Sequence, residues 1–255
     1  MNSTIDIVWL QDDLRVADNP LLHFTSPPAH LLCLYVLDKQ WCAPLIEGEP
    51  APRIGPARLR FLWQSLIELR GELLQRGSDL LVRIGNPSDV VIELASSLKA
   101  RQVYVASHPG VEETQHIQSV AHGLPSQTAL HCIESGRLFD HQALPFERDA
   151  LPESFSAFRR CVEEACSISS SLPAPITLPP WPEAPRGFPP LKAVCEESAA
   201  WQPDTRQGYA YMGGESAAHA RLQDYLWRQN GASTYKKTRN GLLGANFSTR
   251  VSPWL

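Results

Sequence analysis

The first half of the chain alternates between two patterns of apolar residues. Five short, continuous apolar runs occupy residues 5–10, 31–37, 80–85, 102–107 and 129–134. Such runs are typical of strands that are buried on both faces of a parallel sheet. The stretches between them repeat apolar residues at helical spacing, as Leu59, Leu66 and Leu73 do before the stop signal at Gly77. The alternation predicts an α/β fold with a Rossmann-like, doubly wound, parallel five-stranded sheet.

The pattern changes after residue 135. A helix is predicted at about residues 152–166, and residues 173–190 then hold eight of the 22 prolines, which indicates an extended connector. A second amphipathic helix is predicted at about residues 215–229, after a flexible start at Gly213 and Gly214. We therefore expect three regions: an α/β domain over 1–135, a helix and proline-rich connector over 136–210, and the beginning of a helical domain over 211–255.

Composition narrows the class of protein. The 255 residues contain no apolar run near the ~20 needed to cross a membrane, and no signal peptide precedes the first strand. A cytoplasmic location is expected. The six cysteines form no CxxC pair and no zinc spacing, so we expect reduced and mostly buried thiols.

Charge is distributed unevenly along the chain. Residues 221–255 hold six basic residues and one acid, a net charge of +5, which leaves −9 on the rest of a chain whose total is −4. This predicts an anion-facing surface near the C-terminus. The alternative is an ordinary solvated charged face.

The loop after the first strand offers little specific chemistry. It lacks the glycine-rich fingerprint of a dinucleotide fold and the Walker phosphate loop. Asp13 and Arg15 can pair with each other, and Asp18-Asn19-Pro20 can cap a short helix. The histidines are scattered, with no expected nucleophile–base pair and no metal spacing. Glu112 and Glu113 open a helix, where they complement its dipole or accept hydrogen bonds from an N–H-rich heterocycle.

The C-terminal segment is the most informative part. Ser248, Thr249, Arg250 and Ser252 place hydroxyls and a cation beside a helix start that Ser252 and Pro253 signal. Helix N-termini offer unpaired N–H groups to phosphate, and Tyr235 with its basic neighbours adds an aromatic face. The pattern predicts a site for a pyrophosphate-containing cofactor. The alternative is an ordinary cap beside a basic loop.

Several quoted stretches carry a family resemblance. "IVWLQDDLRVADNP" and "GGESAAHARLQDYLWRQNGASTYKKTRNGLLGANFSTRVSPWL" resemble the photolyase/cryptochrome family, and especially its DASH-type cryptochromes. The resemblance covers the whole chain and is most specific in the second stretch. Gln11 and Asp12 depart from the more usual basic or amide residues, and Asn246-Phe247 stands where Asp-Tyr is common.

The resemblance implies cofactors and a partner. The α/β domain of such proteins can hold an antenna such as methenyltetrahydrofolate, for which Glu112 and Glu113 are loosely matched positions. FAD would be held by a helical domain that begins with Tyr235, Ser248, Thr249, Arg250 and Ser252. The implied function is light-driven repair of cyclobutane pyrimidine dimers in DNA, favouring single strands, or blue-light photoreception. No catalytic acid, base or metal ligand is expected from this chain.

The last residues raise a question of completeness. A helix of a few residues cannot bury its apolar side alone, so we expect Trp254 and Leu255 to be exposed. We interpret the chain as the N-terminal part of a DASH-type protein: truncated, split from a second chain that completes the helical domain, or an incomplete sequence. The alternatives are a stand-alone α/β antenna or nucleotide-binding module without catalysis, and an inactive relic.

Overall fold

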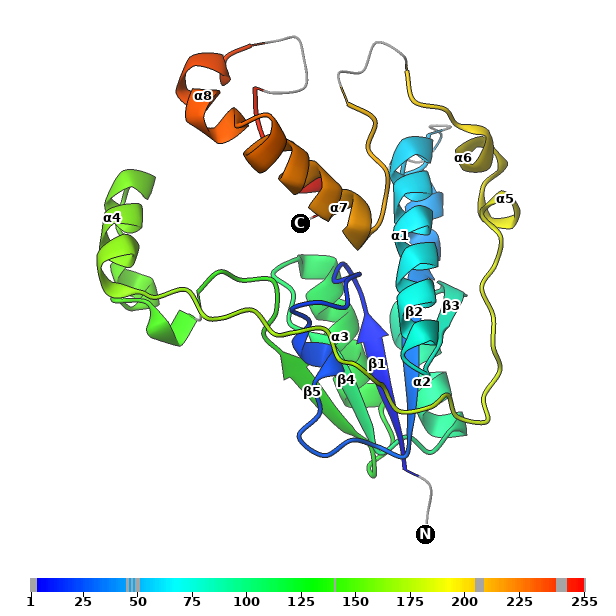
Figure 1. The fold of residues 1–255 in the computed structure, drawn as a ribbon. Helices are drawn as coiled ribbons and strands as arrows, with labels where there is room; N and C mark the ends of the chain where they lie inside the picture. The colour runs from blue at the N-terminus through cyan, green and yellow to red at the C-terminus, as the bar shows by residue number, and fades with distance from the viewer. Residues whose placement is uncertain are drawn as a thin grey trace.

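A parallel sheet of five strands forms the centre of the molecule in the computed structural model (Figure 1), which describes residues 4–44, 46, 48, 51–139, 141–204, 209–241 and 247–254. The strand order is β3-β2-β1-β4-β5, and every neighbouring pair is parallel. The strands are β1 Ile5–Leu10, β2 His30–Asp38, β3 Leu80–Gly85, β4 Gln102–Ala106 and β5 Ala129–Ile133. The predicted fold class is confirmed, and each strand lies within one residue of its expected bounds.

Helices cover both faces of the sheet. The α-helices are α1 Pro56–Gln75, α2 Pro87–Ser97, α3 Val111–Gly123, α4 Phe155–Ala165, α5 Leu191–Val194, α6 Glu196–Ala200, α7 Glu215–Gln223 and α8 Gly231–Thr238. Single turns are η1 Pro20–Leu22, η2 Lys39–Cys42, η3 His141–Ala143, η4 Arg148–Ala150 and η6 Ser252–Trp254, and η5 Asp224–Arg228 is a π-helical turn. Helix α4 stands apart from the sheet (Figure 1).

Alternation along each strand divides the core into two layers. Val8 and Leu10 of β1 pack with α1, whereas Ile7 and Trp9 pack with α2 and α3 on the other face. All four side chains are essentially inaccessible to solvent, as expected where both faces of a parallel sheet are covered. The direction of each side chain at the carboxyl end of β1 is therefore fixed, and Gln11 continues the face of Trp9.

The proline-rich connector covers the β3 edge of the sheet. The N–H of Val82 in β3 donates to the Gly187 carbonyl at 2.9 Å, and the N–H of Leu31 donates to that of Pro180 at 3.0 Å. Phe188 packs against Trp63 of α1, whose indole donates to the Pro189 carbonyl at 3.2 Å. The connector, in the expected extended conformation, thus satisfies one backbone group of the edge strand β3 and one at the start of β2.

The segment leading into α7 is fixed to α1, which corrects the expectation of a flexible start. The N–H of Gly213 donates to Gln64 at 2.9 Å, and that of Gly214 to the Ser65 hydroxyl at 3.0 Å. A Cβ at Gly213 would lie 2.0 Å from the Phe61 carbonyl oxygen, and Gly214 has a φ of +108°. Both glycines are required by close approach and backbone conformation.

Two further expectations need correction. The predicted helix over residues 215–229 is α-helical only to Gln223 and continues as the π-helical turn η5, which is followed by Asn230 in the left-handed conformation. All six cysteines are free, as expected, but only Cys33 is buried. Burial raises the pKa of the Cys33 thiol to about 12. Across the described residues, no helix is long and apolar enough to cross a membrane.

Candidate functional site

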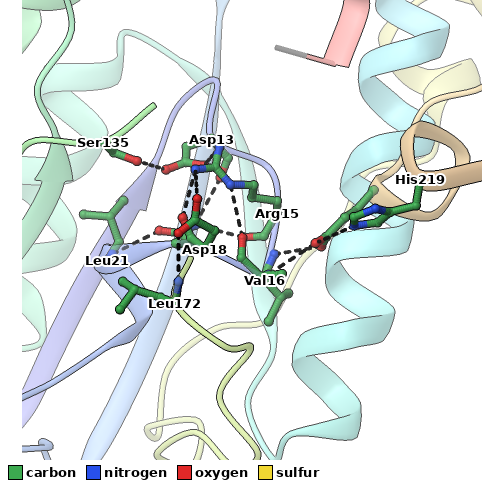
Figure 2. Close-up of polar contacts among 11 residues, drawn as sticks. Asp13, Arg15, Val16, Asp18, Leu21, Ser135, Leu172 and His219 are labelled. Carbon is green, nitrogen blue, oxygen red and sulfur yellow. Dashed lines mark hydrogen bonds and ion pairs between the residues drawn. The ribbon is translucent and has the colours of Figure 1, made fainter. Parts of the chain in front are cut away.

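The loop after β1 contains the polar pairs that the sequence suggested. Arg15 pairs with Asp13 at 3.0 Å, and Asn19 caps η1 by accepting from the N–H of Leu21 at 3.0 Å. Ser135, which follows β5, donates to the second Asp13 oxygen at 2.6 Å (Figure 2). Burial raises the pKa of the Asp13 carboxyl, although Ser135 and Arg15 oppose the shift. Asp13 therefore has a structural role at the carboxyl edge of the sheet.

The same loop joins the α/β region to the later segments. Asp18 accepts from the N–H of Leu172 in the connector at 2.9 Å. The carboxylate of Glu215, the first residue of α7, accepts from the backbone N–H groups of Val16 at 2.9 Å and Ala17 at 3.3 Å (Figure 2). Residues that are far apart in the sequence thus meet at one loop.

A crevice opens at the carboxyl ends of β1 and β2, beside the point where the strand order reverses. Ligands of open α/β sheets bind at such positions. The crevice contains about 40 Å³ and is lined by aromatic and acidic side chains: Trp9, Gln11, Asp12, Tyr35, Val36, Asp38, Trp41, Pro87, Glu112, Glu113 and His116. The structure therefore brings Glu112 and Glu113 to the same small cavity.

The crevice contains one buried acceptor without a partner. Gln11 Oε1 is inaccessible to solvent and has no hydrogen-bond partner within the described part of the chain. With Glu112 and Glu113 it forms an acceptor set that suits the N–H-rich edge of a pterin. The enclosed volume is that of about three water molecules. Both Glu112 oxygens already accept hydrogen bonds from Arg53, at 2.7 and 2.9 Å.

His116 makes a pairing that the sequence analysis did not expect. Its Nδ1 lies 3.1 Å from Ser88 Oγ, and its Nε2 lies 3.2 Å from Asp38 Oδ2. This resembles a nucleophile, base and acid in a row. However, the Ser88 hydroxyl donates to the Asn86 oxygen at 2.9 Å, and that oxygen also caps α2. The Ser88–His116 contact therefore stabilises the start of α2 and does not activate Ser88 as a nucleophile.

The structure places the predicted flavin residues on two segments. Tyr235 lies on α8 and is 46% exposed, while Ser248, Thr249 and Arg250 precede the single turn η6, which begins at Ser252. Asn246 and Leu255 lie outside the described residues. Trp254 is half-buried, contrary to expectation: its indole donates to the Met212 carbonyl at 3.0 Å and packs against Phe61 at 5.7 Å between ring centroids.

A buried arginine holds the segment with the predicted hydroxyls. Arg221 of α7 donates from Nε to the Thr249 carbonyl at 2.8 Å and from Nη2 to the Ser248 carbonyl at 3.1 Å. Within the described residues, the hydroxyls of Ser248, Thr249 and Ser252 make no hydrogen bond to protein. Hydroxyls beside backbone N–H groups are a donor set that suits a diphosphate, so these residues fit the phosphate part of FAD.

A larger cleft separates this segment from the sheet. It contains about 420 Å³, within the size range of ligand clefts, and lies between the β1 loop, α1, α7 and η6. Its charged and titratable lining is mixed, with Asp12, Arg15, Asp18, Arg58, Glu215 and His219, and Phe61, Leu222 and Trp254 contribute apolar surface.

Sequence reasoning missed Gln11 as an acceptor and Arg221 altogether. In the sequence, Gln11 stands out only as a departure from a family pattern. In the sequence, Arg221 is one of the six basic residues of the charged end, and nothing local marks it as buried. The one available signal was its spacing of four from Tyr225, since residues i and i+4 share a helix face.

The structure is a doubly wound α/β unit with a crevice at the carboxyl ends of its strands, and Gly213, Gly214 and Glu215 join it to the segment that begins with α7. The family model for DNA photolyase matches residues 6–183. The DASH cryptochrome of Gloeobacter violaceus is 36% identical over 258 residues, covering 100% of this chain and 51% of that protein. The chloroplastic/mitochondrial DASH cryptochrome of Arabidopsis thaliana is 34% identical, covering 98% of this chain and 44% of that protein.

The comparison with solved structures points to the same family. The crystal structure of a Synechocystis cryptochrome matches with a TM-score of 0.85 and 30% identity, covering 100% of this chain and 53% of that one. The chain belongs to the photolyase/cryptochrome family and is of the DASH type. It spans about half the length of the curated relatives it matches.

Proposed function

We propose that this chain supplies the α/β domain and the first part of the flavin-binding helical domain of a DASH-type cryptochrome or photolyase, with boundaries near residues 135 and 210. The observation that carries the proposal is the segment at residues 248–252, which Arg221 of α7 holds through the carbonyls of Ser248 and Thr249. Tyr235, Ser248, Thr249, Arg250 and Ser252 would hold the FAD phosphates. When bound, FAD supplies light-driven electron transfer, and this chain orients it and balances its charge.

The proposed substrate is DNA that carries cyclobutane pyrimidine dimers, with blue-light photoreception as the other role of such proteins. The basic end of the chain supports an anionic partner, because its lysines and arginines attract phosphate groups. Trp227, which is 70% exposed, and Tyr235, which is 46% exposed, lie in the same part of the chain and offer rings on which bases can stack. The rest of the active site would come from further helical sequence or from a second chain. The free thiols suit a reducing compartment such as the cytoplasm.

A chimera tests this proposal. The part of the Synechocystis cryptochrome that aligns with this chain is replaced by all 255 residues, and the protein is incubated with FAD and desalted. We expect a flavin absorption spectrum at near-stoichiometric amount, and repair of dimers in single-stranded DNA under blue light. The combined S248A, T249V and S252A variant should lose flavin, whereas the S169A and S170A control should keep it. A colourless chimera would contradict the proposal.

The crevice supports an antenna as a second proposed function. The buried Gln11 oxygen, with Glu112 and Glu113, offers acceptors to a pterin such as methenyltetrahydrofolate, provided that the Arg53–Glu112 pair opens. Fluorescence titration of the intact chain with free pterin tests this proposal. We expect R53A to bind at least as tightly as the unmodified chain and E113Q to bind more weakly. The absence of binding in both the unmodified chain and R53A would exclude an antenna at this crevice.

A further inference from the structure

Arg221 is buried, so its side chain does not contact a ligand directly, and protein groups on several sides hold it in place. Its side chain is 0% exposed and lies between two tyrosine faces, with Cζ 4.7 Å from the Tyr209 ring centroid and 5.3 Å from that of Tyr225. Asp224 lies 3.4 Å away and balances the charge. A guanidinium is rarely buried without such partners, so this arrangement fixes its direction.

The two carbonyls that Arg221 binds belong to consecutive peptide groups. In a trans peptide the C=O and N–H bonds point in opposite directions, and the described residues contain no cis peptide. The carbonyls of Ser248 and Thr249 face Arg221, so the N–H groups of Thr249 and Arg250 point away from it. A cation bound at a carbonyl also polarises the peptide and strengthens its N–H as a donor.

The backbone at Arg250 supports an anion site. Its φ is +56°, a left-handed conformation that is uncommon for residues other than glycine. Left-handed residues occur in backbone concavities in which successive N–H groups point to one side and bind anions. The Arg250 guanidinium lies over the Phe247 ring, 4.3 Å from its centroid.

We propose that Arg221 is the positioning residue of a backbone cradle for a diphosphate, formed by the N–H groups of Thr249 and Arg250. The inference deepens the proposed flavin site and rests on it. Arg221 acts through the peptide groups and does not touch the ligand. Its loss should weaken phosphate binding by orientation and polarisation, and more than the loss of an equal charge elsewhere on the same helical segment.

The test uses the intact chain and inorganic pyrophosphate, followed by amide resonances in ¹⁵N NMR at constant ionic strength. We expect the amides of Thr249 and Arg250 to shift on titration. R221M should weaken the affinity by at least about tenfold, as the loss of charge-assisted hydrogen bonds does, and R221K should recover part of it. The control R228M removes an equal charge from an exposed position of η5 and should change the affinity by less than about threefold.

The proposal would be overturned by no shift of these amides in the unmodified chain, by unchanged affinity in R221M, or by equal losses in R221M and R228M. Unchanged amide resonances in the α/β region would show that R221M remains folded. If R221M does not fold, the comparison is made with R221K instead. If R221K bound pyrophosphate as tightly as the unmodified chain does, that result would also contradict the proposal. The chimera separates the two ideas, since a chimera that binds FAD equally well with R221M refutes the positioning role alone.

Discussion

Asp79 is a buried carboxylate whose charge is compensated from two parts of the chain. Its side chain is 1% exposed, and Arg70 of α1 donates to it at 2.7 Å while Arg186 of the connector makes a second ion pair. Burial by itself raises its pKa, but the hydrogen bonds from Arg70, the Leu80 N–H and Arg186 outweigh burial. The pKa therefore lies below the ordinary value of 3.8.

The lowered pKa of Asp79 gives stability a defined pH dependence. A carboxyl with a lower pKa in the folded state stabilises the protein above its unfolded pKa, and this contribution is lost as the pH falls through the folded pKa. We expect D79N to cost about 3 kcal/mol at pH 7 and the difference from the unmodified chain to shrink below about pH 4. Urea unfolding between pH 3 and 7 measures both.

The matched control is E164Q on the exposed face of α4, which should stay within about 0.5 kcal/mol throughout. A D79N difference that is constant across this pH range would show that the charge of Asp79 is not what the arginines stabilise.

At the scale of elements, the connector should contribute to the sheet although it has no regular secondary structure. F188A removes the ring that packs on Trp63 and under Arg70. We expect a loss of about 2 kcal/mol, less than for a fully buried phenylalanine, and faster hydrogen exchange at the Val82 amide. F155A, at a ring that is 76% exposed, is the control. Unchanged Val82 exchange in F188A would mean that the connector does not depend on this anchor.

The elements show what sequence could and could not predict. The strands and the α2 cap were predictable because apolar runs and the Asn86-Pro87 pair act locally. The run of prolines predicted an extended connector, but not the contact of Gly187 with Val82, because no local pattern encodes a partner about a hundred residues away. The same limit applies to the site: the hydroxyls near residue 250 were visible as a motif, whereas Arg221 acquires its role only through tertiary contacts.

At the scale of the whole molecule, α7 is joined to the α/β region through a close backbone approach. G213A would place a methyl group 2.0 Å from the Phe61 carbonyl oxygen. We expect it to cost about 2 kcal/mol through overpacking and to release α7, so that its amides exchange before those of the sheet. The control is G71A in α1, where an added Cβ would meet no atom within 4 Å apart from the nearby backbone of its own helix. G71A should be neutral or stabilising by up to about 1 kcal/mol. Simultaneous exchange of α7 and the sheet in G213A would refute this coupling.

The late arrival of the connector at the β3 edge has a consequence during synthesis. The last strand ends at Ile133, but Gly187, which accepts from Val82, follows only after about fifty more residues. At ribosomal rates of about 5–20 residues per second, the nascent sheet would wait roughly three to ten seconds with that edge uncovered. An open edge strand is a template for pairing with another chain. The yield of native protein should therefore depend on how fast ribosomes translate the stretch between the sheet and the prolines, and on whether a chaperone shields the edge meanwhile.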